Sequence, residues 1–305
     1  MKIVGEKEEG SLQAKFPHPF FFSLGFITYD LYKNRRIIGG ASAYSAILAR
    51  NFGVASAIAT SIGEDFRDFD ALKGIQLAYQ IGERTATFIN KPAEERGKGM
   101  SERRIQYVTS VANRIKEETI PEGWFNAEIV YICPVLNELE EDIIKRFEGS
   151  MIGVAPQGWL RSVDEGGRIE KKKWEKANEV LSKVDFVIVS EEDVFEEDIP
   201  IYARLSDIFM ITRGSQGAEV YHDKGKYHEH IPAFVREEVD ATGPGDVFGA
   251  AFLLRYHETN DAVESAIFAS CAASFVVEKV GVKGVPTKEQ VLKRMKNESG
   301  NISSG

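Results

Sequence analysis

The sequence predicts an α/β protein whose mostly parallel sheet is covered by helices on both sides. Short apolar runs alternate with segments of helical periodicity along most of the 305 residues, as in successive β-α-β units. The apolar runs lack the polar alternation of a half-exposed strand, which indicates strands buried on both faces of a parallel sheet. Ligands of such sheets bind beyond the carboxyl ends of the strands, so the turns there are candidate sites.

The first elements illustrate both patterns. Phe20–Leu24 is a short, almost wholly apolar run that ends at Gly25 and predicts a buried strand. Small and apolar residues from Ala41 to Phe52 keep helical spacing. Further strands are expected at 54–62, 127–133, 151–155, 185–189 and 208–212, and helices at 138–147, 174–182, 262–280 and 287–297. We expect one domain over residues 1–305, with a disordered polar tail at 298–305.

Composition disfavours several classes of protein. Asp and Glu outnumber Lys and Arg by 47 − 38 = 9, and an acidic chain argues against a nucleic-acid surface. No apolar run is long enough to span a bilayer, and the N-terminus lacks the regions of a secretion signal. Cys133 and Cys271 stand in apolar surroundings without metal-type spacing, which indicates core thiols. We therefore expect a cytoplasmic protein without nucleic-acid or membrane partners.

Residues 239–252 contain a glycine-rich turn that leads into a helix of small apolar residues. Gly243 and Gly245 lack a Cβ, so the backbone there can approach a ligand closely. Pro244 fixes φ and suits the first turn of a helix. The free N–H groups and positive dipole end of that helix form a ready site for phosphate oxygens. Asp246 is then either a dipole partner or a general base beside the phosphate.

The string Asp240-Ala241-Thr242-Gly243-Pro244-Gly245-Asp246 resembles the signature D-T-x-G-A-G-D of the ribokinase/phosphofructokinase-B (PfkB) family of carbohydrate kinases. Two positions depart from it, because Ala241 replaces a hydroxyl residue and Pro244, which has no N–H, replaces a small residue. The resemblance implies a ribokinase-like three-layer α/β/α sandwich in which main-chain N–H groups of this turn form an anion hole. It also implies that Asp246 is the catalytic base and that Gly243 and Gly245 belong to the catalytic turn.

A second part of the resemblance lies near the N-terminus. Family members carry an Asp after the first strand and a Gly-Gly turn before a helix, and both contact the acceptor. Asp30, Gly39 and Gly40 match these features in order and rough spacing. Tyr44 stands where ribokinases place an Asn for the sugar, which makes ribose itself a less suitable acceptor. For Asp30, a turn-forming residue ahead of a hairpin is the alternative.

The resemblance also implies a nucleotide site. Thr212, Gly214 and Gly217 match the family's T-x-G-x-x-G turn, which contacts the nucleotide phosphates. A plain hairpin turn is the alternative for these glycines. Ser270 falls roughly where ribokinases put an Asn near the base.

Metal binding is implied by Ser190 and Asp193, which stand where the family often has N-x-x-E. Ser190 would lie near the phosphates, and Asp193 would hold Mg²⁺ through water, since this ion prefers oxygen ligands and keeps waters. An acidic first turn of a helix is the alternative. The implied cofactors are ATP and Mg²⁺, and the loop at 281–286 resembles one that in some members holds a monovalent cation.

Strands of alternating character are predicted at 85–90 and 104–108, with a polar linker between them. In ribokinase-like proteins such strands build a small β lid over the substrate, which often also forms the dimer surface. The resemblance therefore implies a lid from roughly 26–38 and 84–109 and leaves a homodimer through that lid as an option.

Two segments, 39–46 and 157–161, resemble the inositol-kinase-like branch of the family. They imply that Gln157 and Arg161 meet a polyol or a charged acceptor. Nucleoside kinases share the same framework, and a binding protein that lost turnover is a further alternative. A dinucleotide-dependent oxidoreductase lacks its G-x-G-x-x-G after the first strand. We expect an ATP-dependent kinase of a sugar or polyol hydroxyl, and these segments favour an inositol-like acceptor.

Overall fold

The structure, a computed structural model, describes residues 2–4, 18–32, 35–91 and 105–302. Its centre is a ten-stranded sheet in the order β1-β6-β5-β2-β9-β10-β13-β14-β15-β16. The strands are β1 Lys2–Val4, β2 Phe21–Leu24, β5 Ser56–Gly63, β6 Gln76–Gly82, β9 Ile129–Ile132, β10 Met151–Val154, β13 Phe186–Ser190, β14 Ile208–Thr212, β15 Ala218–His222 and β16 Tyr227–Ile231.

The middle of this sheet is parallel from β6 to β14, and the antiparallel pairs lie at its two edges. β2 and β9, which pair side by side, are buried at every position. Strands covered on both faces bury side chains in both directions, which explains their continuous apolar sequences. The predicted mostly parallel α/β sheet is therefore confirmed.

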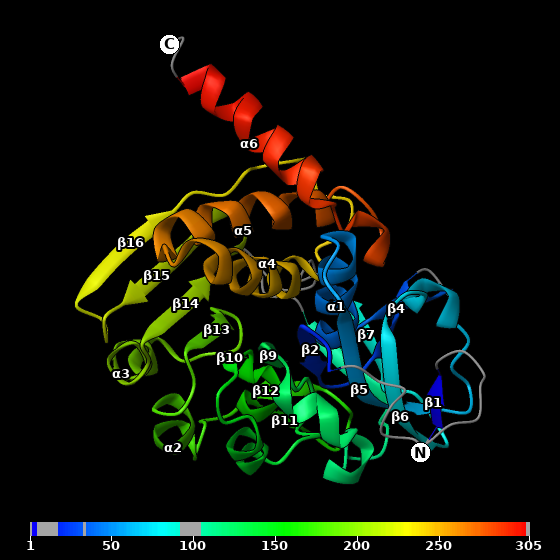
Figure 1. Ribbon diagram of the computed structural model, residues 1–305. Helices are drawn as coiled ribbons and strands as arrows, with labels where there is room; N and C mark the ends of the chain where they lie inside the picture. The colour runs from blue at the N-terminus through cyan, green and yellow to red at the C-terminus, as the bar shows by residue number, and fades with distance from the viewer. Residues whose placement is uncertain (1, 5–17, 33–34, 92–104, 303–305) are drawn as a thin grey trace.

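Helices cover both faces of the sheet and give three layers (Figure 1). Figure 1 shows α1, α4, α5 and α6 on one side and α2 and α3 on the other. The helices are α1 Ala41–Asn51, α2 Ala177–Leu181, α3 Ile199–Leu205, α4 Pro244–Thr259, α5 Ala262–Val276 and α6 Lys288–Ile302. The predicted α/β/α sandwich is confirmed, although the second helical layer consists largely of short helices and 3₁₀ turns.

The helix expected at 138–147 is wrong, because only a 3₁₀ turn, Glu141–Arg146, forms there. The side chain of Glu138 explains the difference. Its fully buried carboxylate accepts hydrogen bonds from the backbone N–H groups of Phe26, Val135 and Leu136, at 2.7 to 3.1 Å. The segment before residue 141 is thus a loop, which the Glu138 side chain ties to the backbone at Phe26. The residues that remain, from 141 onward, are too few for a full helix.

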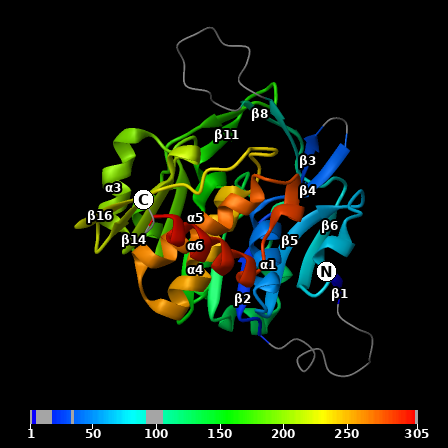
Figure 2. The ribbon, with the colours of Figure 1, turned by 90° about the horizontal axis from the view of Figure 1, so that it is seen from above.

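A second sheet of four strands, in the order β4-β3-β7-β8, packs beside the main one. Its strands are β3 Thr28–Tyr32, β4 Arg35–Gly39, β7 Thr87–Lys91 and β8 Ile105–Ser110. Figure 2 shows β3, β4 and β8 at the side of the molecule away from α4 and α6. A small hairpin, β11 Arg161–Val163 and β12 Ile169–Lys171, joins this sheet at β8 through a bridge between Tyr107 and Arg168.

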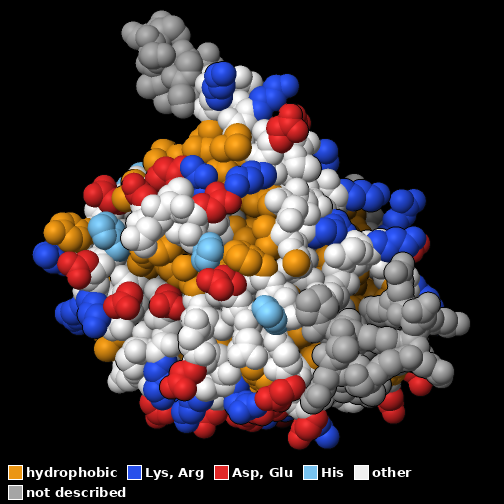
Figure 3. Space-filling model, viewed as in Figure 1, with side chains coloured by type: hydrophobic (Ala, Val, Ile, Leu, Met, Phe, Trp, Pro, Cys, Tyr) orange, Lys and Arg blue, Asp and Glu red, His pale blue; other side chains and the backbone are white. Residues whose placement is uncertain are grey.

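The C-terminal helix α6 projects from the body of the molecule in Figure 1 and runs to Ile302. The tail expected to be disordered from 298 onward is therefore helical as far as residue 302, and the rest of that tail lies outside the described residues. Figure 3 shows acidic and basic side chains intermingled over one face. None of the described helices combines the length and the apolar character that a membrane-spanning segment needs.

Candidate active site

The turn before α4 has the geometry of an anion site. Gly243 is the N-cap residue of α4 and has a φ of +90°, a left-handed conformation that favours glycine. Pro244 is the first helical residue, where its missing N–H matters least. The N–H groups of Gly245 and Asp246 are in the first turn, and the N-cap residue, a glycine, offers no capping side chain. Pro244 therefore removes only one of the N–H groups that the resemblance places in the anion hole.

The side chain of Asp240 anchors this turn through two hydrogen bonds. One oxygen of its carboxylate accepts the backbone N–H of Thr242 at 2.9 Å, and the other accepts the backbone N–H of Gly281 at 3.0 Å. A side-chain oxygen that bonds the backbone two residues later forms a local turn of its own. The first residue of the signature therefore joins the α4 turn to the loop that follows α5.

Tyr44, predicted to contact the acceptor, has another role. Its side chain is 0 % exposed, and a Cβ at residue 243 would overlap its ring. Tyr44 therefore packs directly beneath Gly243 and supports the turn from α1. We correct the prediction on this point, because a residue covered in this way does not present its ring to the pocket.

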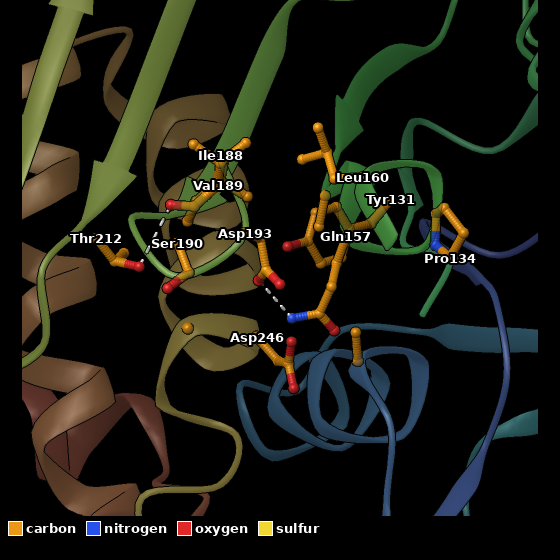
Figure 4. A pocket seen from close by; sticks show the side chains of 13 residues that line it. Tyr131, Pro134, Gln157, Leu160, Ile188, Val189, Ser190, Asp193, Thr212 and Asp246 are labelled. Atoms are coloured by element: carbon orange, nitrogen blue, oxygen red, sulfur yellow. Dashed lines mark hydrogen bonds between the residues drawn. The ribbon is translucent and has the colours of Figure 1, made fainter. Parts of the chain in front are cut away.

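A pocket opens between the N-terminus of α4 and the carboxyl ends of β9, β13 and β14. Figure 4 shows Asp246 on one side of it, Gln157 and Asp193 opposite, and Ser190 and Thr212 nearby. Its lining residues are Ala41, Tyr131, Pro134, Ala155, Gln157, Leu160, Ile188, Val189, Ser190, Asp193, Thr212, Gly245 and Asp246. The structure therefore brings together residues that the sequence assigned to the catalytic turn, the donor site and the acceptor site.

One wall of the pocket is a buried ion pair. Arg161 Nε donates to Asp193 Oδ1 at 2.7 Å, and Arg161 Nη2 lies 2.7 Å from the same oxygen. Gln157 Nε2 donates to Asp193 Oδ2 at 2.8 Å, as Figure 4 shows. The side chains of Arg161 and Asp193 are 7 % and 8 % exposed. Burial of this kind requires pairing, so each charge needs the other.

This pairing changes the roles predicted for all three residues. The Asp193 carboxylate is neutralised and both its oxygens are used, so the prediction that it holds Mg²⁺ is not supported. Arg161 lies behind Asp193 and does not line the pocket, whereas Gln157 does. Within residues 2–4, 18–32, 35–91 and 105–302, no group of three His, Cys, Asp or Glu side chains is arranged to hold a metal ion. The described residues thus offer no ready-made cage for Mg²⁺, an ion that kinase sites commonly bind through one or two carboxylates and the phosphates of the substrate.

The predicted nucleotide residues fall into three groups. Thr212 and Ser190 line the pocket. Gly214 and Gly217 lie in the turn between β14 and β15, with φ of +56° and +95°, outside the pocket lining. Ser270 is buried on α5, and its hydroxyl donates to the carbonyl oxygen of Pro232 at 2.8 Å. Ser270 is therefore covered by the segment that leads to α4, which removes it from the position predicted near a base.

The predicted acceptor residues meet at the start of α1. Gly39 ends β4, and a Cβ there would overlap Oδ2 of Asp30 on β3. Gly40, with a φ of +91°, is the N-cap residue of α1, and the next residue, Ala41, lines the pocket. Asp30, Gly39 and Gly40 therefore lie together at the edge where the small sheet joins the main domain, outside the pocket lining but next to Ala41.

Two residues that the sequence did not single out complete this edge. Asn90 Nδ2 on β7 donates to Asp30 Oδ1 at 3.0 Å, and Gln106 Nε2 on β8 donates to Asn90 Oδ1 at 2.7 Å. The three side chains form a polar row across β3, β7 and β8. Asn90 and Gln106 are polar positions in alternating strands, a pattern that does not separate a functional residue from a solvated one.

Tyr131 is a further lining residue that sequence reasoning missed. It is the sole polar side chain of β9, whose sequence is Ile-Val-Tyr-Ile. Burial raises the pKa of its hydroxyl well above the ordinary value, with smaller contributions from Cys133 and Asp246. The feature of the sequence that could have pointed to Tyr131 is its position as a single tyrosine in an otherwise aliphatic central strand.

A helix N-terminus with main-chain amides and a carboxylate, beside a pocket beyond the strands of a parallel sheet, is the kind of site that phosphotransferases use. The sequence matches the description "pfkB family carbohydrate kinase" over residues 33–288, more than half of the chain. The protein belongs to that family of kinases, which transfer a phosphoryl group to a hydroxyl acceptor.

Relatives and solved structures agree with this assignment. A nucleoside kinase of Methanocaldococcus jannaschii is 26 % identical over 301 residues, covering 92 % of this chain and 91 % of its own. A ribokinase of Bacillus subtilis is 42 % identical over 83 residues, 27 % of this chain and 28 % of its own. A pyrophosphate-dependent kinase of the ribokinase family superimposes with a TM-score of 0.74 at 21 % identity, covering 90 % and 99 % of the two chains. At this identity the structural likeness shows the shared fold.

Proposed function

We propose that this protein is an ATP-dependent kinase that phosphorylates a hydroxyl of a sugar or polyol, with Asp246 as the general base. One observation carries the proposal. Asp246 stands in the first turn of α4, beside main-chain amides at a helix start whose N-cap residue is a glycine, and lines the same pocket as Gln157, Ser190 and Thr212. A base next to an anion site is the arrangement that phosphoryl transfer to an alcohol needs.

The reaction then proceeds in one transfer. The acceptor oxygen attacks the γ-phosphorus of ATP, its proton passes to a carboxylate oxygen of Asp246, and the bond to the β-phosphate oxygen breaks. The N–H groups of Gly245 and Asp246 and the dipole of α4 stabilise the negative charge on the transferring group. Mg²⁺ bound to the nucleotide would neutralise phosphate charge, and this chain's residues do the positioning.

Donor binding rests on Thr212 and Ser190, which line the pocket opposite the α4 turn. Pyrophosphate is a second candidate donor, favoured by the buried position of Ser270 beneath Pro232. A solved structure of the same fold, with a TM-score of 0.70 and 20 % identity over 90 % of this chain and 99 % of its own, is a pyrophosphate-dependent kinase complexed with myo-inositol. ATP and pyrophosphate therefore both belong in the assay.

Acceptor binding is assigned to the edge formed by Asp30, Gly39 and Gly40. The row from Asp30 through Asn90 to Gln106 offers carboxylate and amide groups to several hydroxyls at once. Such a row suits a polyhydroxylated ring and supports an inositol-like acceptor. The four-stranded sheet that carries these residues would then act as a lid, and its outer surface is where a homodimer would form.

A nucleoside acceptor is the second candidate. The Methanocaldococcus jannaschii relative, which aligns with 92 % of this chain, is a nucleoside kinase. Tyr29 and Phe88 lie on the same small sheet, where aromatic rings would contact a base. Tyr29 is already engaged, because its hydroxyl donates to Asp68 at 2.7 Å and its ring stacks on Phe66.

The test is donor consumption by the purified protein with a panel of sugars, inositols and nucleosides. We expect turnover with ATP and a polyol, and a loss of roughly 10²- to 10⁴-fold in kcat for Asp246→Asn. Asp240→Asn serves as the comparison variant, because it alters the side chain that anchors the turn before α4 and leaves the proposed base in place. Near-normal turnover of D246N would overturn the assigned base. Ligand binding without turnover for any acceptor would instead identify a binding protein.

A further inference from the structure

The floor of the pocket contains a hydroxyl that the proposed reaction does not yet use. Tyr131 is 1 % exposed, and its hydroxyl has no hydrogen-bond partner among the described residues. A buried, unbonded hydroxyl destabilises a protein relative to a bonded one, so such groups call for an explanation. Figure 4 shows the Tyr131 ring behind Gln157, with its hydroxyl directed toward the middle of the pocket.

The chain leaves space for this hydroxyl on α4. Residue 249 is a glycine in the interior of the helix, and a Cβ there would overlap the Tyr131 oxygen. The hydroxyl therefore occupies the place of a side chain at position 249. Glycine inside a helix is less favourable than alanine, so its presence at position 249 calls for a reason such as this close approach.

The space at position 249 that the Tyr131 hydroxyl occupies is next to Asp246. A helical side chain covers the turn on the N-terminal side of its own Cα, and residues three apart lie on one face of a helix. The space at Gly249 thus adjoins the position of Asp246, three residues earlier. The negative charge of Asp246 is also close enough to contribute to the raised pKa of the Tyr131 hydroxyl. The hydroxyl accordingly keeps its proton and is a donor, never a base, near neutral pH.

We propose that Tyr131 is a positioning residue for the catalytic carboxylate. In the reacting complex a rotation of the Asp246 side chain brings its carboxylate to the Tyr131 hydroxyl, which donates a hydrogen bond to it and fixes its direction while it accepts the proton of the substrate hydroxyl. The inference rests on the proposed function of Asp246 and adds a second residue, on the central strand β9, to the same step. Tyr131 does not exchange its proton with the substrate.

Tyr131→Phe removes the oxygen and keeps the ring, so it tests the idea directly. We expect kcat to fall about 10- to 100-fold, the range for losing a hydrogen bond to a charged group. KM for both substrates should change less than twofold, since Tyr131 contacts neither. The melting temperature should stay equal or rise, because an unbonded buried hydroxyl has been removed. Tyr79→Phe, on β6 of the same sheet and outside the pocket lining, is the matched control and should leave kcat unchanged.

A double-mutant cycle separates this role from simple packing. If Tyr131 acts through Asp246, Y131F should cause no further loss of kcat in a D246N background. Equal losses in both backgrounds, or a Y131F kcat within twofold of the wild type, would overturn the role of Tyr131. A lower melting temperature for Y131F would contradict the unbonded state of its hydroxyl. The proposed function is tested separately, because it fails if D246N itself retains wild-type turnover or if the wild-type protein turns over no acceptor.

Discussion

Two glycine-rich turns lie at the ends of strands or starts of helices around the pocket, and they use glycine for different reasons. In the turn before α4, Gly243 has a φ of +90° and lies directly on the Tyr44 ring. In the turn after β14, Gly217 has a φ of +95° and lies against the backbone of Ile231. Both positions exclude a side chain, but the first glycine lies within three residues of the lining residues Gly245 and Asp246, whereas Gly217 is separated from the lining residue Thr212 by the whole turn.

The comparison shows that a glycine motif does not by itself locate a ligand. Gly217 allows the hairpin β15–β16 to approach the end of β14, which is a requirement of folding. Gly243 allows α4 to begin directly over the Tyr44 ring, which places the first-turn amides of the helix as the proposed anion site requires. Gly214 differs from both, because a Cβ there would meet no atom within 4 Å. Substitution at the three positions should therefore give three different outcomes.

Gly243→Ala should have the largest effect. The new Cβ would overlap the Tyr44 ring, and φ of +90° is unfavourable for alanine, so the turn must shift. A displacement of about 1 Å in a catalytic group lowers rates by about 100-fold. We expect a loss of kcat of that order, together with a lower melting temperature, measured by steady-state kinetics and thermal unfolding.

The double variant with Tyr44→Leu provides the control for this prediction. Leucine removes the ring atoms that the new Cβ would meet, so part of the lost kcat should return even though Y44L alone is destabilising. Full activity of G243A would contradict the view that this turn positions the transferred group. The absence of any recovery in the double variant would show that φ strain, rather than Tyr44, is responsible.

Gly217→Ala should affect stability and leave chemistry intact. Its Cβ would overlap the carbonyl oxygen of Ile231, which is a backbone atom that cannot rotate away. We expect a free energy of unfolding lower by roughly 2 to 3 kcal/mol, the combined range for strain and overpacking. Chemical denaturation measures this loss, and kcat per folded molecule should match the wild type. A selective fall in kcat would move this turn into the catalytic site.

The sequence predicted the layers of this fold well because they depend on local pattern. Buried strands such as Phe21–Leu24 and the small-residue helix after Gly243 follow from composition within one segment. The short 3₁₀ turn in place of the helix at 138–147 does not, because the carboxylate of Glu138 bonds the backbone of Phe26 more than one hundred residues away. A hydrogen bond between residues so far apart in the chain cannot be recognised from a single sequence.

The site shows the same division between local and distant information. Asp246 and its turn were predictable, since the spacing of glycine and aspartate sets their geometry within one helix start. Tyr44 beneath Gly243 and Arg161 on Asp193 were not, because each pair joins elements that only folding brings together. Residue type correctly indicated polar groups near the pocket, but it did not reveal that two of them neutralise each other.

The smallest effect is expected for Gly214→Ala, and it tests whether the second turn touches the donor at all. Its φ of +56° makes alanine unfavourable by about 1 kcal/mol, and no protein atom would clash with the new Cβ. The space beside it is therefore open to a phosphate. We expect KM for ATP to rise several-fold while kcat and KM for the acceptor stay constant. An unchanged KM for ATP would show that the donor does not reach this turn and would favour a short donor such as pyrophosphate, held by Thr212 and Ser190 alone.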